Sequence, residues 1–521
     1  MEPTPPNFEI ELKLEVPAED LPRLQRHARI RSLTQGRATT RELRSTYFDT
    51  AGLDLRRRGI ALRVRKVGRV WLQTVKTAGV VHAGLFERAE HEVTLPSDRP
   101  DVTRIPDAEL RAAIEREIGG RTLQPVVETQ LRRTQRRVRF AGSELQLALD
   151  VGEIRTRSGS APVRELELEL VSGRSAALFG LALGLQADLD LRPSIESKVA
   201  RGYALLTGER PSPAMAPAIS LRPEATLEDV LAAVVGTCVQ QIQANQVPAH
   251  DGIDPEGVHQ MRVGVRRLRS ALSLFAPMLP LEQAEPFRQE LRWLAAELGA
   301  ARDIDVFLEE TLEPLLRHRP DDPALKRLRD EALELRADAY RNLRAALDSP
   351  RYPRLQLQLG GWLAARAWRE QPLSAEGAIL FAPAREQTAA LLGRRHRKAH
   401  ELGHDIATGT VEEQHRLRVH LKKLRYGAEF LRSVHPRADA RRYLRRLARL
   451  QDVLGRLNDV ATAERLLYQL LERLGDEAGI AHHRAAGYVA GWTARLAESH
   501  GLRLAKRWKA FEKAEPFWED A

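Results

Sequence analysis

The sequence predicts a multidomain α+β protein, in which a β-rich domain is followed by a larger all-α domain. Three observations support this fold class. The chain has 521 residues, which is too long for one ordinary hydrophobic core. Up to about residue 205, short segments alternate apolar and polar residues with the period of two that is typical of β-strands. Beyond about residue 225, Leu, Ala, Arg and Glu recur with helical spacing.

Composition limits the classes of protein to consider. Hydrophobic residues make up 43% and charged residues 29%, as in ordinary folded domains, and the net charge of +11 predicts attraction to nucleic acid, an anionic membrane or polyphosphate. The single Cys238 excludes an intrachain disulfide and a cysteine metal cage. No apolar run reaches membrane-spanning length, and the first residues lack signal-peptide features. We therefore expect the reducing cytoplasm as the location, with polyphosphate granules as a candidate association.

The predicted strands of the first domain carry an unusual charged face. In "FEIELKLEV" (8–16), Glu9, Glu11, Lys13 and Glu15 share one parity, so they lie on one side of a strand. Similar alternation predicts strands at 60–66, 70–76, 88–95, 143–150 and 164–170. Some of these strands supply mainly acids and others mainly bases.

Two interpretations of the charged faces are open. One is an antiparallel sheet with a solvated polar face. The other is a closed barrel with the polar face inward, because Glu165, Glu167 and Glu169 would repel one another unless cations lay among them. Clustered carboxylates bind hard cations such as Mg²⁺ or Mn²⁺, and inward Arg and Lys bind phosphate oxygens. An interior with both would suit a metal-complexed polyphosphate.

The ordered motifs of residues 7–206 resemble the CYTH domain, the triphosphate tunnel metalloenzyme superfamily. The resemblance rests on "EIELK" (9–13), "STYFDTAGLDLRRRGIALRVRK" (45–66), "ELELEL" (165–170) and "SIESKVARGYAL" (194–205). It implies an antiparallel eight-stranded β-barrel tunnel. Family members act on inorganic triphosphate, thiamine triphosphate or nucleoside triphosphates, and some are adenylyl cyclases.

The resemblance also implies a role for individual residues of this chain. Residues implied in catalysis are Glu9, Glu11, Lys13, Arg63, Arg65 and Lys76. Those implied in substrate binding are Lys13, Arg63, Arg65, Lys76, Arg88, Arg133 and Lys198, with Arg132 or Arg136 as alternatives to Arg133. Those implied in binding Mg²⁺ or Mn²⁺ are Glu9, Glu11, Asp150, Glu165, Glu167 and Glu169. No protein nucleophile is needed, because an oriented water can attack the terminal phosphorus in line.

The second part of the chain contains an internal repeat. Residues 207–224 are rich in Pro, Ala and Ser and predict a linker, so the helical domain covers about 225–515. "HQMRVGVRRLR" begins at His259 and "HRLRVHLKKLR" at His415, an offset of 415 − 259 = 156. "LGAARDIDV" at Leu298 and "LGRLNDVAT" at Leu454 keep the same offset. A duplication explains both matches, with repeats at about 225–380 and 381–515.

The repeated motif places a basic stripe beside an apolar stripe on each helix. A solvated basic face is one interpretation, but two copies in register with few acids favour anion binding. The motif resembles the CHAD domain, which implies two helical bundles related by pseudo-twofold symmetry and binding of inorganic polyphosphate. The residues it implies are His259, Arg262, Arg266, Arg269, His415, Arg418, Lys422 and Arg425. Arg302 corresponds to Asn458 and Asp305 to Ala461, so the second copy is expected to bind more weakly.

The combined prediction is a metal-dependent inorganic triphosphatase whose helical domain binds polyphosphate. A CYTH domain followed by a CHAD domain resembles bacterial inorganic triphosphatases. The open alternatives are adenylyl cyclase or thiamine triphosphatase activity in the same tunnel, and a polyphosphate-binding protein without enzymatic activity. Nucleic acid is a weaker candidate partner, because it would leave the acidic residues unexplained, and no membrane partner is expected.

Overall fold

The structure is a computed structural model that describes residues 7–77, 79–369, 374–406, 409–475 and 478–519. The chain forms two compact units. The first, here called the barrel unit, comprises Met1–Pro211 together with Ser349–Ala367. The second, here called the helical unit, comprises Ser212–Asp348 together with Trp368–Ala521.

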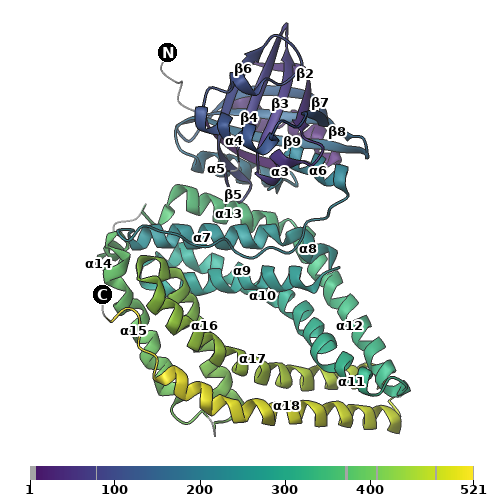
Figure 1. Cartoon of the computed structure of the whole chain (residues 1–521), viewed down its shortest axis with the longest axis vertical. Helices are drawn as coiled ribbons and strands as arrows, with labels where there is room; N and C mark the ends of the chain where they lie inside the picture. Colours follow the sequence, from purple (N-terminus) through teal and green to yellow (C-terminus); the bar gives the residue numbers. More distant parts are fainter. Residues whose placement is uncertain (1–6, 78, 370–373, 407–408, 476–477, 520–521) are drawn as a thin grey trace. The chain divides into compact units, whose positions relative to one another are not determined.

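In the described part of the barrel unit, eight antiparallel strands close into a barrel in the order β1-β9-β8-β7-β2-β3-β4-β6, and pairing of β6 with β1 completes the ring (Figure 1). The strands are β1 (Asn7–Glu15), β2 (Thr34–Asp49), β3 (Ala61–Val67), β4 (Val70–Lys76), β6 (Leu85–Leu95), β7 (Gln124–Phe140), β8 (Ser143–Thr156) and β9 (Gly159–Ser172). Two short strands, β5 (Val80–His82) and β10 (Arg192–Pro193), pair with β6 and β1. The predicted eight-stranded antiparallel barrel is therefore confirmed.

The alternating pattern of the strands separates an apolar outer face from a charged inner face. On β3 and β4, Leu62, Val64 and Val75 pack under helix α4 (Ala108–Ile118), which covers the outside of the barrel. Helix α5 (Ala176–Gln186) packs in the same way against β1 and β9. Because the apolar parity is used by these helices, the charged parity faces the barrel interior.

Helix α6 (Lys198–Thr207) covers part of the inner face. Its residue Gly202 lies so close to Val127 and Ile154 that a Cβ there would be 2.4 Å from Val127 Cγ1. Val127 and Ile154 have the parity of the charged residues on β7 and β8, so α6 packs against the inside of these strands. The Ser197 side chain caps the helix by accepting from the Ala200 N–H. Lys198, the first residue of α6, is thereby held at the edge of the charged region.

Smaller elements complete the barrel unit. The short helices are α1 (Leu21–Gln25), α2 (Ala28–Leu33) and α3 (Asp54–Arg57), with 3₁₀ turns η1 (Ala18–Asp20) and η2 (Val102–Arg104). Helix α13 (Arg351–Ala365) also packs here, against α5, although its sequence lies within the predicted helical domain. Gly360 allows this contact, because a Cβ at this residue would lie 2.4 Å from both Phe179 Cε1 and Ala83 Cβ.

The helical unit consists of long helices with several short ones between them. In the described residues these are α7 (Leu227–Ala244), α8 (Gln246–Asp251), α9 (Pro255–Leu274), α10 (Leu281–Phe307), α11 (Glu313–His318), α12 (Pro323–Asp348), α14 (Ala375–Ala378), α15 (Ala384–Gly403), α16 (Val411–Leu431), α17 (Arg437–Leu474) and α18 (Ile480–Glu512). A π-helical segment, η4 (Leu308–Leu312), joins α10 to α11, and η3 (Ala276–Met278), η5 (Ala367–Arg369), η6 (Ile379–Phe381) and η7 (Arg432–Val434) are 3₁₀ turns. Helices α17 and α18 run side by side (Figure 1). None of the helices in the described residues is long and apolar enough to cross a membrane.

The internal repeat appears as two helix pairs with equivalent starting positions. Helices α9 and α10 correspond to α16 and α17, and the second helix of each pair starts at Leu281 or Arg437, an offset of 437 − 281 = 156. The N-cap residues Asp254 and Thr410 keep the same offset, and each side chain accepts a backbone N–H of its helix. Helices α9 and α16 pack against each other, so the two copies of the basic motif come together.

Candidate functional site

Strand pairing places the predicted charged residues of the first domain on one continuous inner surface. Lys13 is the register partner of Glu167 across β1 and β9. Glu165 is the partner of Asp150 across β9 and β8, and Asp150 is the partner of Arg133 across β8 and β7. Directly paired residues point to the same side of a sheet. Acids and bases from distant parts of the sequence therefore meet in the barrel interior.

Lys198 and Arg133 are held by three carboxylates in a buried network. The Lys198 Nζ atom lies 3.0 Å from Asp150 Oδ2 and 2.7 Å from Glu167 Oε1, and it also contacts Glu165. The Arg133 guanidinium donates to both oxygens of Asp150 at 2.6 Å and contacts Glu167. Asp150 and Glu165 are 0% exposed, so removing one cation would leave buried carboxylates with less positive charge to compensate them.

The two acids of the "EIELK" strand also form ion pairs with protein cations. Lys76 Nζ lies 2.6 Å from Glu9 Oε2, and Arg88 bridges Glu9 and Glu11 at 3.1 Å and 2.6 Å. Lys13 Nζ lies 2.9 Å from Glu11 Oε1. Burial alone would lower the pKa of Lys13, but Glu11 and other carboxylates outweigh this effect and raise it. Lys13 is thus a permanent positive charge of the interior.

Arg63 and Arg65 differ from the other interior cations, because hydroxyl groups rather than acids are their nearest partners. Arg65 Nε donates to Ser45 Oγ at 2.7 Å, and Arg63 Nη2 donates to Thr74 Oγ1 at 2.9 Å. Among the described residues Arg65 forms no ion pair, and the only one of Arg63 is with Glu90 at 3.7 Å. Burial lowers the pKa of Arg65 to about 9, and the neighbouring Arg63 and Arg133 guanidinium groups add to this effect. This pair of guanidinium groups is suited to bind an anion.

Tyr47 is an interior residue that the sequence analysis did not identify. It is the register partner of Arg63 across β2 and β3. Burial would raise the pKa of its hydroxyl, but Arg63, Arg65 and Lys76 outweigh burial and lower it. The residue stands in the quoted "STYFDT" segment with the parity of Ser45, so strand alternation could have found both.

Glu169 is an interior carboxylate that lacks a cationic partner among the described residues. It pairs with Glu11 across β9 and β1 and accepts a hydrogen bond from Gln146 Nε2 at 3.2 Å. Burial raises its pKa, and the negative charges of Glu9, Glu11 and Glu167 raise it further. An uncompensated carboxylate next to Glu9 and Glu11 supplies oxygen donors of the kind that a hard divalent cation prefers.

A preformed metal site is nevertheless absent from the described residues, since no group of three or more His, Cys, Asp or Glu side chains is arranged to hold an ion. Burial would raise the pKa of Glu167, but Lys13, Lys198 and Arg133 lower it well below its usual value. The acids Asp150, Glu165 and Glu167 are therefore occupied by protein cations. A metal role for these three remains a prediction.

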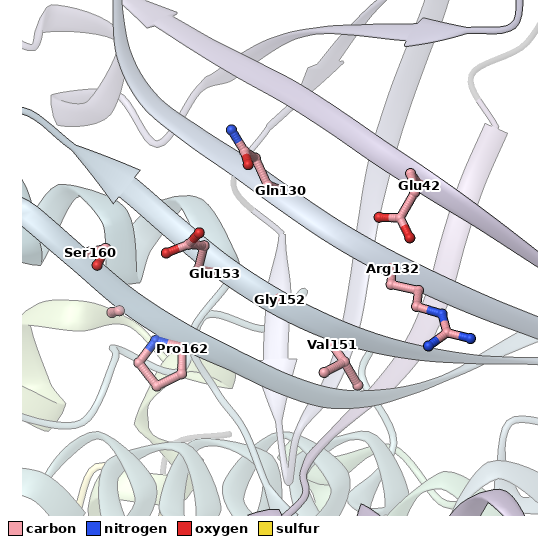
Figure 2. A pocket seen from close by; sticks show the side chains of 9 residues that line it. Glu42, Gln130, Arg132, Val151, Gly152, Glu153, Ser160 and Pro162 are labelled. Atoms are coloured by element: carbon pink, nitrogen blue, oxygen red, sulfur yellow. The ribbon is translucent and has the colours of Figure 1, made fainter.

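The outer surface of the barrel has its own depression, separate from the interior. Figure 2 shows it over β2, β7, β8 and β9, with Glu42, Gln130, Arg132 and Glu153 around Gly152. Its volume is ≈ 540 Å³. Arg132 has the opposite parity to Arg133, which forms the interior ion pairs. Of the alternatives at this position, Arg133 is thus the residue that faces the interior, and Arg132 faces outward.

Basic side chains of three helices line a second site, in the helical unit. The cavity, here called the basic cleft, has a volume of ≈ 730 Å³. Its basic and aromatic lining residues are Arg262, Arg266 and Arg269 of α9, Arg288 and Arg292 of α10, and His415, Arg418, Lys422, Lys423 and Tyr426 of α16. Six of the eight residues predicted for polyanion binding lie in this lining. His259 and Arg425 do not.

Four cations from equivalent positions of the two copies form the centre of the basic cleft. Arg262 corresponds to Arg418, and Arg266 to Lys422, each with the offset of 156. Burial lowers the pKa of Lys422 to about 6, and Arg418, Arg266 and Arg262 lower it as well. Lys422 forms no ion pair among the described residues. Only the negative charge of Asp459 acts to raise its pKa. Such crowding of positive charge is unfavourable unless an anion binds.

Two further arginines of the repeated motif, the predicted Arg425 and the neighbouring Arg267, have partners outside the cleft. Arg425 lies 2.8 Å from Glu429 and also bonds Gln451. The Arg267 guanidinium lies 5.9 Å from the ring centre of Phe430. Arg288 and Arg292 were missed by sequence analysis, because they lie outside the repeated motif on the next helix. Only the packing of α10 against α9 brings them to the basic cleft.

The positions at which the two copies diverge have distinct structural roles. Asn458 Oδ1 accepts from Arg418 at 2.7 Å and lies 3.1 Å from His415 Nδ1. Asp305 is 1% exposed and accepts from Arg336 Nε at 2.7 Å and from the Tyr340 hydroxyl at 2.8 Å. Asp305 therefore links α10 to α12 rather than contributing to the cleft.

Two family models match the chain. The CYTH domain matches residues 7–203, which include all the predicted interior residues, and the CHAD domain matches residues 233–468, which include the basic cleft. The crystal structure of the CHAD domain from the plant Ricinus communis is similar to this chain, with 31% sequence identity and a TM-score of 0.51, over 58% of this chain and 98% of that one.

Curated relatives also match, among them one from Haemophilus influenzae and one from Mycobacterium tuberculosis. An inorganic triphosphatase of Haemophilus influenzae is 33% identical over 164 residues, or 31% of this chain and 46% of that protein. An uncharacterised protein of Mycobacterium tuberculosis is 28% identical over 348 residues, or 60% of this chain and 63% of that protein. The chain thus covers less than two thirds of the length of either relative. Taken with the closed barrel and the duplicated helices, these matches identify the chain as a CYTH domain followed by a CHAD domain.

Proposed function

We propose that this protein hydrolyses inorganic triphosphate in the barrel interior with the help of Mg²⁺ or Mn²⁺, and that its basic cleft binds polyphosphate. One observation carries the first part of the proposal. The interior combines Arg63 and Arg65, for which hydroxyl groups are the nearest partners, with a group of carboxylates that has too few cations around Glu169. An anion alone would be repelled by the carboxylates, and a metal alone by the arginines. A metal-complexed triphosphate satisfies both.

Binding would exchange the partners of the interior ion pairs. Lys76 and Arg88 now neutralise Glu9 and Glu11. When a triphosphate enters, these two cations can turn to phosphate oxygens beside Arg63 and Arg65. Glu9, and Glu11 once Lys13 also turns to phosphate, would then be able to hold a divalent cation together with Glu169. The chemistry of these donors fits Mg²⁺ or Mn²⁺, which prefer oxygen ligands.

Hydrolysis then needs no side-chain nucleophile. The cationic side chains Lys13, Arg63, Arg65, Lys76 and Arg88 hold the phosphates and neutralise their charge. A water molecule attacks the terminal phosphorus in line, a new P–O bond forms, and the bridging P–O bond breaks. The products are phosphate and pyrophosphate, and the proton of the water goes to an interior carboxylate or to solvent. The bound divalent ion would supply further charge neutralisation on the phosphate oxygens.

The helical unit supports the second part of the proposal. Its cleft joins equivalent cations from both repeats, and Arg266 and Lys422 form no ion pair within the described residues. A linear chain of phosphates offers regularly spaced negative charges to such a surface. The crowded cations would gain from each phosphate that they neutralise.

Phosphate release by the purified full-length protein tests the enzymatic part. Tripolyphosphate, pyrophosphate, long-chain polyphosphate, ATP and thiamine triphosphate are compared with Mg²⁺ and with Mn²⁺, and cyclic AMP is measured in the ATP reaction. We expect metal-dependent release from tripolyphosphate to be fastest. Faster turnover of ATP or thiamine triphosphate would assign a different reaction to the same interior. Absence of release from every substrate, together with tight polyphosphate binding, would leave a binding protein and refute the proposed activity.

A further inference from the structure

The basic cleft is less symmetric than the duplication that built it. Its four central cations come from equivalent positions, but beyond them the lining holds three arginines of the first copy and no arginine of the second, which supplies Lys423 and His415. Arg269 lies seven residues beyond Arg262 on α9, which corresponds to about 10 Å along a helix. Arg288 and Arg292 of α10 lie beside it in the cleft lining. We call Arg269, Arg288 and Arg292 the arginine arm.

The second copy has no equivalent of the arginine arm. The positions that correspond to Arg288 and Arg292 are Leu444 and Ala448, since 444 − 288 and 448 − 292 both equal 156. Arg425, the equivalent of Arg269, is neutralised by Glu429 at 2.8 Å. The residue that corresponds to Glu429 in the first copy is the uncharged Ser273, which lines the cleft.

The arm keeps an excess of positive charge. Arg288 and Arg292 share one carboxylate, Glu285, at 3.5 Å and 2.8 Å. Arg269 forms no ion pair among the residues that the structure describes. Three guanidinium groups and one carboxylate leave a net charge of about +2 at one end of the cleft. Arg269 is exposed, so a ligand can reach it.

We propose that the arginine arm makes the basic cleft selective for phosphate chains longer than triphosphate, because it binds the phosphates that extend beyond the four central cations. This inference rests on the proposed polyphosphate-binding function of the cleft. A triphosphate can satisfy the central cations alone. A longer chain reaches both the centre and the arm.

The test measures the affinity of the full-length protein for tripolyphosphate and for long-chain polyphosphate by isothermal titration calorimetry with EDTA present. All proteins carry Arg65→Met, so that tripolyphosphate binding in the barrel does not obscure the cleft. The arm is removed by the double change Arg269→Ala and Arg292→Ala. A second variant, Ser273→Glu, instead supplies the acid that the second copy has. Arg266→Ala removes a central cation, and Arg445→Ala on α17 is the matched control for loss of one positive charge.

Both arm variants are expected to weaken long-chain binding about tenfold or more, as the loss of charge-assisted contacts implies, and to leave tripolyphosphate binding within about twofold. Arg266→Ala should weaken both ligands, and Arg445→Ala neither. If the parent protein binds and the arm variants weaken both ligands equally, or weaken neither, the selectivity is refuted while the cleft function stands. If the parent binds no phosphate chain at all, the cleft function itself fails.

Discussion

Substitution of Arg65 by methionine should stabilise the unliganded protein, whereas the same change at Arg133 should destabilise it. Both arginines point into the barrel interior, and they differ in their partners. Arg133 holds Asp150 and Glu167, while the guanidinium of Arg65 has Ser45 as its hydrogen-bond partner. Burying a cation without a carboxylate partner lowers the free energy of unfolding, and a methionine of similar length would remove this penalty.

The size of the effect follows from the structure. The pKa of Arg65 falls from 12.5 to about 9, which at about 1.4 kcal/mol per pKa unit corresponds to about 5 kcal/mol against the charged form. The folded-state pKa is lowered, so this cost is present in full below about pH 9 and disappears as the pH rises towards 12.5. Partial solvent contact and the lost Ser45 hydrogen bond reduce it, so we expect a net gain of about 1–2 kcal/mol. Arg133→Met should cost up to about 3–5 kcal/mol, because it takes the guanidinium from two buried carboxylates and leaves Asp150 with Lys198 alone.

Equilibrium urea unfolding at pH 7.5 without phosphate or metal measures both changes, with circular dichroism as the signal. Adding tripolyphosphate and Mg²⁺ should then raise the stability of the wild-type protein more than that of Arg65→Met, because the anion loses a principal contact in the barrel while the basic cleft is unchanged. The reasoning is refuted if Arg65→Met lowers the free energy of unfolding as much as Arg133→Met does. That result would mean that Arg65 stabilises the empty barrel through contacts other than ion pairs.

Three further outcomes are expected. The affinity of the cleft for polyphosphate should rise as the pH falls from about 8.5 to about 6, by at most about tenfold per pH unit. The reason is that the pKa of Lys422 is lowered to about 6 in the free protein, and a bound anion favours the protonated side chain. The affinity of the Lys422→Arg variant should depend less on pH. Gly202→Ala should lower the free energy of unfolding by about 1–3 kcal/mol in urea, because its Cβ would overlap Val127, and an unchanged value would contradict the packing of α6 inside the barrel. Chelation by EDTA should abolish tripolyphosphate hydrolysis in a phosphate-release assay while polyphosphate binding by calorimetry persists; loss of both would contradict separate sites.

The alternation of apolar and polar residues predicted many of the barrel strands. It failed for the long strands β2 and β7. The stretches at 60–66 and 143–150 overlap β3 and β8, because their apolar parity is continuous: Leu62 and Val64 pack under α4, and the leucines of β8 are buried. β2 and β7 were not predicted as strands, because their outer ends, such as residues 34–42, are exposed and polar on both faces. Closure of the barrel depends on pairing of β1 with β6, which a local pattern does not contain.

The candidate sites likewise contain some residues that local spacing could predict and others that it could not. Residues within repeated or alternating motifs, such as Glu11 and Lys422, were found from spacing. Tyr47 and Arg292 were missed, because their roles depend on which strand or helix packs beside them. The place of α13 in the barrel unit was also not apparent, since Gly360 resembles any other helical glycine until Phe179 is known to lie against it.

The central claim is that the barrel interior performs the hydrolysis and the basic cleft does not. The most direct measurement compares tripolyphosphate hydrolysis by wild type, Glu11→Gln and Arg266→Ala, each with saturating Mg²⁺ or Mn²⁺. Glu11→Gln keeps the shape of the side chain but removes its charge, and it should reduce kcat/KM by a factor on the order of 10² or more. Arg266→Ala should retain the wild-type kcat/KM within about twofold, the spread expected for a residue outside the reacting centre. Hydrolysis that survives Glu11→Gln and is lost in Arg266→Ala would contradict the account.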